Sequence, residues 1–284
     1  MHPGVHHGLS NADYHASPGL SATQLRRLLR SPFHFAGTLG QQFGAVYPQD
    51  EDTNPSLFNG TLTHCALLEP GEFHKRYVIG PTVSKNSLVW RDFVAVATER
   101  GQQVITMQEQ DKAFAQARSL AALPEVAELL RDGAPEVSAW WMDEDDETPA
   151  GEPVLCRCRP DWVASVAHGA GVVLLDVKTT KDASPAAFGA SVARYGYHVQ
   201  QAHYLRGYRK ASGLEVHGFV FAVVESEYPH AAMAYMLDDE AAAEGVRRRR
   251  QAMARYRECR RTNHWPAYGV GIQTVSLPRW SLSE

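Results

Sequence analysis

Apolar residues recur at helical spacing in several parts of the chain. The first such stretch, residues 20–30, has Ser21 in position to cap its N-terminus and Pro32 just past its end. The same spacing predicts helices over residues 58–70, 109–131, 185–211 and 239–260. Pro70 ends the first of these, and Pro124 breaks or kinks the second. Residues 40–56 are predicted to form a loop, and residues 262–284 a tail or docking segment.

Strand-like patterns fill the middle of the chain. They predict strands over residues 137–142, 154–166, 172–177, 216–225 and 231–237. Residues 172–177 are apolar almost throughout until Asp176, which is typical of a strand that is buried on both faces. Strands that alternate with helices in this way predict an α/β fold with extra helices at the N-terminus.

Composition narrows the class of protein. The 284 residues are 44% hydrophobic and 21% charged, and no apolar run is long enough for a membrane-spanning helix. We expect one domain over residues 1–284, with a helical elaboration at about 18–70 and a helix plus tail at about 239–284. No secretory signal is evident at the N-terminus, so a cytoplasmic location is predicted and the membrane is excluded as a partner.

Charge is unevenly distributed along a chain whose formal net charge is −4. Acidic residues gather at 143–147, which is interpreted as a solvated turn. Arginines gather at Arg26, Arg27 and Arg30 and at 247–250, where a solvated helix with one or two phosphate-facing members is expected. A mildly acidic chain of this kind can still bind nucleic acid through a local basic channel.

Four cysteines are too few and too scattered for a disulfide scaffold. Cys156 and Cys158 alternate with Arg157 and Arg159, so on a strand both thiols lie on one face and are expected to pack in the core. The chain lacks the pattern of cysteines that an iron-sulfur cluster needs, so no such cluster is expected.

Candidate chemistry appears where the buried strand meets charged residues. Asp161 and Asp176 each stand at the polar end of a predicted strand, and Lys178 shares a strand face with Asp176. Paired carboxylates can hold a hard cation that activates water for phosphodiester hydrolysis. Taken alone, an Asp-x-Lys pattern is more often a strand-end salt bridge. Its position directly after a doubly buried strand favours a site, because a buried charge is costly without a partner.

These residues resemble the PD-(D/E)XK nucleases. Pro160-Asp161, a spacer of fourteen residues and Asp176-Val177-Lys178 are similar to the signature of that superfamily. The residues from Gln200 to Tyr204 match the Q-x-x-x-Y motif of RecB-type members, and Gly60 to His64 supply the upstream part. Over about residues 18–210 the chain most resembles the RecE-type exonuclease VIII nuclease domain. The resemblance implies a restriction-endonuclease-like core with a mixed central sheet flanked by helices.

The resemblance also implies residue roles. His64, Asp161, Asp176 and the backbone carbonyl of Val177 would bind Mg²⁺, for which Mn²⁺ should substitute well because it tolerates imidazole better. Lys178 would orient or activate the attacking water, and Gln200 and Tyr204 would support the site or contact DNA. Glu69 is equally compatible with a further metal ligand and with a helix-end residue that pairs with a base. The candidates for contact with DNA are Thr179, Thr180 and Arg159, although the two threonines are also ordinary turn residues.

The function implied is a metal-dependent exonuclease that degrades linear double-stranded DNA, 5′ to 3′, and leaves a 3′ strand for a RecT-like annealing protein. By the same resemblance the chain would form a homo-oligomer, such as a tetrameric ring. Three alternatives stay open at this point. They are a Cas4- or AddB-like nuclease, a DNA-binding subunit that does not cut, and a small-molecule hydrolase with paired carboxylates.

Overall fold

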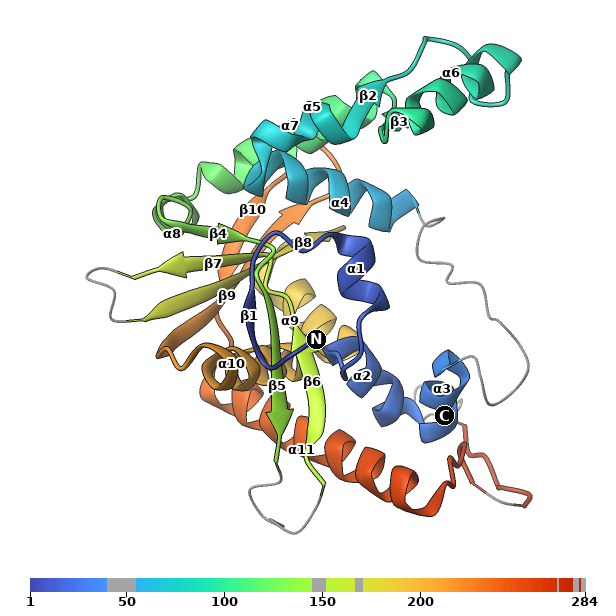
Figure 1. Ribbon diagram of the computed structural model, residues 1–284, viewed down its shortest axis with the longest axis vertical. Coiled ribbons are helices and arrows are strands. Elements are labelled where there is room, and N and C mark those ends of the chain that lie inside the picture. The colour runs from blue at the N-terminus through green and yellow to red at the C-terminus, as the bar shows by residue number, and fades with distance from the viewer. Residues whose placement is uncertain (40–54, 145–151, 167–170, 270, 278–280, 282–284) are drawn as a thin grey trace.

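The computed structural model describes residues 1–39, 55–144, 152–166, 171–269, 271–277 and 281 (Figure 1). The predicted loop at 40–56 therefore lies mostly outside the described residues. The helices are α1 (Asn11–Ala16), α2 (Ala22–Arg30), α3 (Pro32–Ala36), the 3-10 helix η1 (Gly37–Leu39), α4 (Pro55–Leu68), α5 (Pro70–Arg76), α6 (Leu88–Glu99), α7 (Met107–Ala121), α8 (Pro124–Leu129), α9 (Pro185–Tyr195), α10 (Tyr197–Ser212) and α11 (Asp239–Thr262). The strands are β1 (Gly4–His6), β2 (Tyr77–Ile79), β3 (Gln103–Ile105), β4 (Gly133–Pro135), β5 (Ser138–Asp143), β6 (Val154–Cys158), β7 (Trp162–Ser165), β8 (Val172–Thr180), β9 (Val216–Glu225) and β10 (Ala232–Tyr235).

The strands form three sheets. The largest has the order β10-β9-β8-β7-β4, in which β8 and β9 are parallel and the other neighbours are antiparallel. A second sheet has the order β1-β5-β6, and β2 pairs with β3 in a small third sheet on the arm at the top of Figure 1. The expected mixed central sheet flanked by helices is confirmed.

Strand β8 lies inside the large sheet and is covered on both faces. Leu174 belongs to the main core, which includes residues of α9, α10 and α2. Leu175 and Val177 belong to a second core beneath α4, α7 and α8. The predicted doubly buried strand is confirmed, and it explains why the run is apolar at successive positions rather than at alternate ones.

Proline and glycine divide the predicted helices. Helix α2 has a capping box in which the Ser21 N–H donates to Gln24 Oε1 at 2.9 Å. Pro124 separates α7 from α8, and Gly196 separates α9 from α10 with a left-handed backbone (φ 67°). The long predicted helix 185–211 is therefore two helices. None of the helices within the described ranges is both long and apolar enough to cross a membrane.

The prediction of a solvated acidic turn at 143–147 is wrong at its first residue. Asp143 ends β5 with 2% of its surface exposed, and its carboxylate pairs with Arg249 of α11 and lies 3.4 Å from Arg206 of α10. Arg257 is a further partner at 3.8 Å. Arg249 is accordingly buried, which corrects the expectation of a solvated helix there. Residues 145–147 lie outside the described residues.

The second sheet, β1-β5-β6, rests on α10 through polar and apolar contacts. Cys156 and Cys158 are fully buried, as predicted, and burial raises the pKa of both thiols. His203 is fully buried against the ring of Trp141, with Nε2 3.2 Å from Leu20 O and 3.1 Å from Arg157 O. Because both partners are carbonyls, Nε2 donates and the imidazole is held in one tautomer.

The substitution Asp143→Asn is expected to destabilise the fold by about 3–5 kcal/mol, because it leaves buried arginine without a counter-charge. Urea unfolding of the two proteins measures the difference. Glu244→Gln is the control, since that carboxylate pairs with Arg247 and Arg248 on an exposed helix face and its loss should leave the midpoint near that of the wild type. Equal midpoints for all three proteins would contradict the prediction.

A pH dependence follows from His203. Burial lowers its pKa to about 4, below the value near 6.5 of an unfolded histidine. The unfolded chain therefore binds the proton first as pH falls, and stability is lost between about pH 6.5 and pH 4, by about 3 kcal/mol in all. His203→Gln keeps a donor for the two carbonyls but cannot titrate. Its free energy of unfolding, measured from pH 7 to pH 4.5, should fall less steeply than that of the wild type.

Candidate active site and metal centre

The chain passes between the two larger sheets twice, and both passages lie side by side. Glu136 stands between β4 and β5, and Asp161 stands between β6 and β7. The backbone N–H of Glu136 donates to the carbonyl of Asp161 at 2.9 Å. Glu136 has φ 53°, a region that residues other than glycine seldom adopt. Such strained backbone gathers at functional sites.

Val177 is held from two directions beyond the end of β7. The ladder between β7 and β8 stops at the pair Trp162 and Leu175, so the next backbone groups of β8 on that side lack a strand partner. Asp161 Oδ2 accepts from the Val177 N–H at 2.7 Å, and His64 Nε2 lies 3.0 Å from the Val177 carbonyl oxygen. The Asp161 carboxylate and the His64 imidazole thus take the place of a neighbouring strand as partners of the Val177 backbone.

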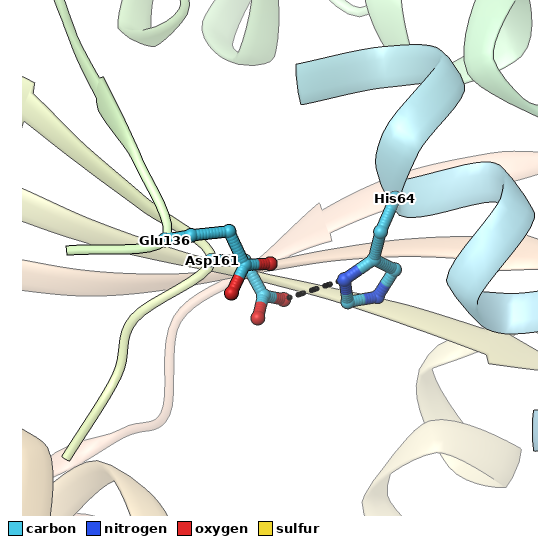
Figure 2. Close-up of side chains that lie close together, drawn as sticks. All are labelled: His64, Glu136 and Asp161. Carbon is cyan, nitrogen blue, oxygen red and sulfur yellow. Dashed lines mark ion pairs between the residues drawn. The ribbon is translucent and has the colours of Figure 1, made fainter. Parts of the chain in front are cut away.

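Three side chains at this point could hold a metal ion. His64, Glu136 and Asp161 each offer one ligand atom, and these atoms lie within 4.8 Å of one another. Figure 2 shows the imidazole of α4 facing the two carboxylates, with His64 Nδ1 3.5 Å from Asp161 Oδ2. Two carboxylates and one imidazole suit a divalent cation, and an added positive charge would relieve their mutual repulsion.

Glu136 is the ligand candidate that the sequence patterns missed. The pKa of Glu136 is raised to about 7, mainly by burial and also by the nearby charge of Asp161, while Arg159 and His64 act to lower it. The strand before it, β4, has three residues and is too short to show a period. The available signal is an acid directly before Val137, which opens a buried run, whereas Asp176 stands directly after one.

Arg159 holds Glu136 in place. Its Nε lies 2.7 Å from Glu136 Oε2 and donates to the Glu136 carbonyl at 3.2 Å, while Nη2 donates to the Leu9 carbonyl at 3.1 Å. The side chain is only 9% exposed. This geometry favours a positioning role for Arg159 over the contact with DNA that was expected.

Asp176 and Lys178 flank Val177 on β8, and their side chains contact α10. The Lys178 ammonium pairs with Asp176 Oδ2, and Gln200 Nε2 donates to Asp176 Oδ1 at 2.5 Å. Burial raises the pKa of Asp176, and Lys178 opposes this effect. Burial lowers the pKa of Lys178, but Asp176 and Asp161 raise it by more, so the ammonium stays charged. The predicted partners Asp176, Lys178 and Gln200 are thus brought together.

Two tyrosines of α10 pack around this pair. Lys178 Nζ lies 4.8 Å from the centre of the Tyr197 ring, a cation–π contact. Tyr204 lies one helical turn after Gln200, and its ring packs against Phe219 at 5.9 Å. Burial raises the pKa of Tyr204 well above its usual value, so the hydroxyl stays neutral. The structure therefore places Tyr204 behind the site, as a support.

The remaining candidate residues lie at the margin of the site. Glu69 forms a two-point pair with Arg76, at 2.6 and 2.7 Å, which is the helix-end role considered for it. A Cβ at Gly60 would come within 3.4 Å of Thr179 Oγ1, so α4 passes close to that threonine. Thr180 Oγ1 donates to the Asp182 carbonyl at 3.2 Å in the turn after β8. Contact of either threonine with DNA stays a prediction.

Comparison with protein families identifies the class of this site. A family model described as "PDDEXK-like domain of unknown function (DUF3799)" matches residues 21–277. The chain belongs to that family. The match includes all the residues of the PDDEXK-like site described above, from His64 to Tyr204. None of the curated proteins matches this chain.

A solved structure supports the fold independently. The chain is similar to a protein from Eubacterium rectale, described as "Putative exonuclease", with a TM-score of 0.58. The sequences are 13% identical, and the superposition covers 95% of this chain and 97% of the other. At that identity the likeness shows a shared fold. A specific relation to RecE stays a prediction.

Glu136→Gln is expected to weaken binding of Mn²⁺ by at least tenfold, because it removes one of three ligand candidates. Isothermal titration of the chain with Mn²⁺ in the absence of DNA measures the change. Glu69→Gln provides a matched control, since that carboxylate is committed to Arg76 and its loss should leave the affinity unchanged. The same loss in both variants, or in neither, would remove Glu136 from the metal centre.

Proposed function

We propose that this PDDEXK-like protein is a metal-dependent exonuclease that hydrolyses linear double-stranded DNA. The observation that carries the proposal is the cluster of His64, Glu136 and Asp161 at the end of the strand that bears Asp176 and Lys178. Paired carboxylates beside a charged lysine suit phosphodiester hydrolysis, in which negative charge develops on the phosphate.

The donor set fits a divalent cation. His64, Glu136 and Asp161 would hold it, with the carbonyl of Val177, which His64 contacts here, as a further oxygen ligand. Asp176 stays a ligand candidate because it directly precedes Val177, whose N–H bonds to Asp161 and whose carbonyl contacts His64. The bound cation would lower the pKa of a water and neutralise charge on the phosphate. We propose Mg²⁺ as this cation, with Mn²⁺ as a good substitute because of the imidazole.

The remaining residues prepare the site for the attacking water. Lys178, charged and held between Asp176 and the Tyr197 ring, orients that water and stabilises the developing charge. Gln200 fixes the second oxygen of Asp176, so the carboxylate cannot rotate away from Lys178. Arg159 likewise holds the Glu136 carboxylate in place.

The finer features of the proposal rest on the motif resemblance. They are cutting from 5′ to 3′, a 3′ single strand handed to an annealing protein, and assembly of several copies around the duplex. The similar solved structure is described only as a "Putative exonuclease", which supports exonuclease activity and says nothing of these finer features.

Digestion of end-labelled linear duplex tests the function. The wild type should release label with Mg²⁺ or Mn²⁺ and not with EDTA, from the 5′ end first. Lys178→Ala should slow release by about 10²–10⁴-fold, as expected for loss of a group that positions a proton-transfer step, and Asp176→Ala should do the same.

A circular duplex separates the two classes of nuclease, because an exonuclease leaves it intact. Lys181→Ala is the control for removal of a neighbouring lysine, since Lys181 is exposed in the turn after β8. Release that does not depend on metal, or that persists in both site variants, would contradict the proposal. Tight binding of DNA ends without release would indicate a subunit that does not cut.

A further inference from the structure

A second feature of the molecule is a cavity of about 510 Å³ beside the active site, which lies between α2, the junction of α9 with α10, and α11. Its volume is within the range of sites that bind small ligands and nucleotides. The lining residues are Thr23, Arg26, Arg27, Leu29, Arg30, Ala193, Arg194, Tyr195, Gly196, His198, Val199, Glu244 and Arg248. We call this the arginine cleft.

The arginine cleft is strongly basic in a chain that is acidic overall. Five arginines and one glutamate line it, whereas the formal net charge of the chain is −4. Its one carboxylate, Glu244, is already paired with Arg247 and Arg248. Such a concentration of guanidinium groups in a hollow favours a polyanion, because the concave wall focuses the positive potential.

The cleft also holds an exposed aromatic ring. Tyr195 is 47% exposed, and the Arg194 guanidinium lies 5.6 Å from the centre of its ring. A basic groove with an exposed aromatic ring is the combination that binds single-stranded nucleic acid, since unpaired bases stack on the ring while phosphates contact the arginines. The bases of an intact duplex are already stacked and cannot use the ring in this way.

The backbone between Tyr195 and Tyr197 connects the cleft to the active site. Gly196 takes a left-handed turn between α9 and α10, and Arg26 lies so close that a Cβ at Gly196 would come within 2.9 Å of it. Tyr195 lines the cleft, Tyr197 lies over Lys178, and the centres of the two tyrosine rings are 5.7 Å apart. Arg26 donates to the Tyr195 carbonyl, and its pKa responds to the charge of Asp176.

We propose that the arginine cleft binds a single DNA strand, continuous with the strand that occupies the active site. The continuity of this strand with the active site rests on the proposed nuclease function. The binding of a single strand in the cleft does not. Tyr195 supplies the stacking surface. Arg30, Arg194 and Arg248 contact the phosphates, while Arg26 fixes the turn that carries both tyrosines.

Fluorescence anisotropy of the full-length protein with a labelled oligothymidine in EDTA tests the proposal without cleavage. Tyr195→Ala should weaken binding about tenfold or more through loss of stacking, and Tyr195→Phe should keep most of the affinity. Tyr228→Ala is the control for removal of an exposed tyrosine elsewhere, since Tyr228 is 90% exposed. Equal affinity of Tyr195→Ala and the wild type would overturn the proposal.

Two neighbouring arginines provide a second, matched comparison. Arg247 and Arg248 both pair with Glu244 on the exposed face of α11, but of these two only Arg248 lines the cleft. Arg248→Ala should reduce the slope of log affinity against log salt by about 0.7, as for one lost phosphate contact with a single strand. Arg247→Ala should leave the slope unchanged. The same slope for both variants would overturn the proposal.

Two competition experiments test whether the cleft prefers a single strand over a duplex or over free phosphate. Unlabelled blunt duplex should compete less well than the unlabelled single strand, and inorganic phosphate should compete only at far higher concentration. Equal competition by the duplex would overturn the assignment to a single strand. Failure of the wild type to cut linear duplex, with these binding results intact, would refute the nuclease function and leave the cleft as a strand-binding site.

Discussion

The site depends on which groups bond to the backbone of β8 beyond Leu175, where its pairing with β7 ends. Inside a sheet both backbone groups of Val177 would be satisfied by a neighbouring strand. Here the Asp161 carboxylate takes the N–H and the His64 imidazole lies against the carbonyl. Backbone hydrogen bonding therefore draws two potential metal ligands, from α4 and from the link before β7, to one residue of the central strand.

Burial of charge explains the rest of the arrangement. Asp176 is 2% exposed, so its carboxylate is tolerable only because Lys178 and Gln200 engage its two oxygens. On the other side of the strand end, Glu136 is offset by Arg159. A cation brought to this acidic cluster would find ligands already oriented by their neighbours, which lowers the entropy lost on binding.

Sequence patterns predict the elements of this fold whose formation depends on residues close together in the chain. The apolar run of β8 and the cap of α2 depend on neighbouring residues, and the structure confirms both. The motif residues Asp176, Lys178 and Gln200, to which the resemblance pointed, lie together in the structure, and Asp161 bonds to the next residue, Val177. Asp143 was misassigned because its partners come from α10 and α11, about 60 to 110 residues away. No local pattern records a contact of that kind.

The two passages between sheets give the site a property that neither sheet has alone. Glu136 and Asp161 meet only when β4 and β7 have joined the large sheet and β5 and β6 have joined the second sheet. His64 joins them only when α4 has packed on the large sheet. A chain that has folded in part thus keeps these three side chains apart, so the candidate metal centre forms only with the completed tertiary structure.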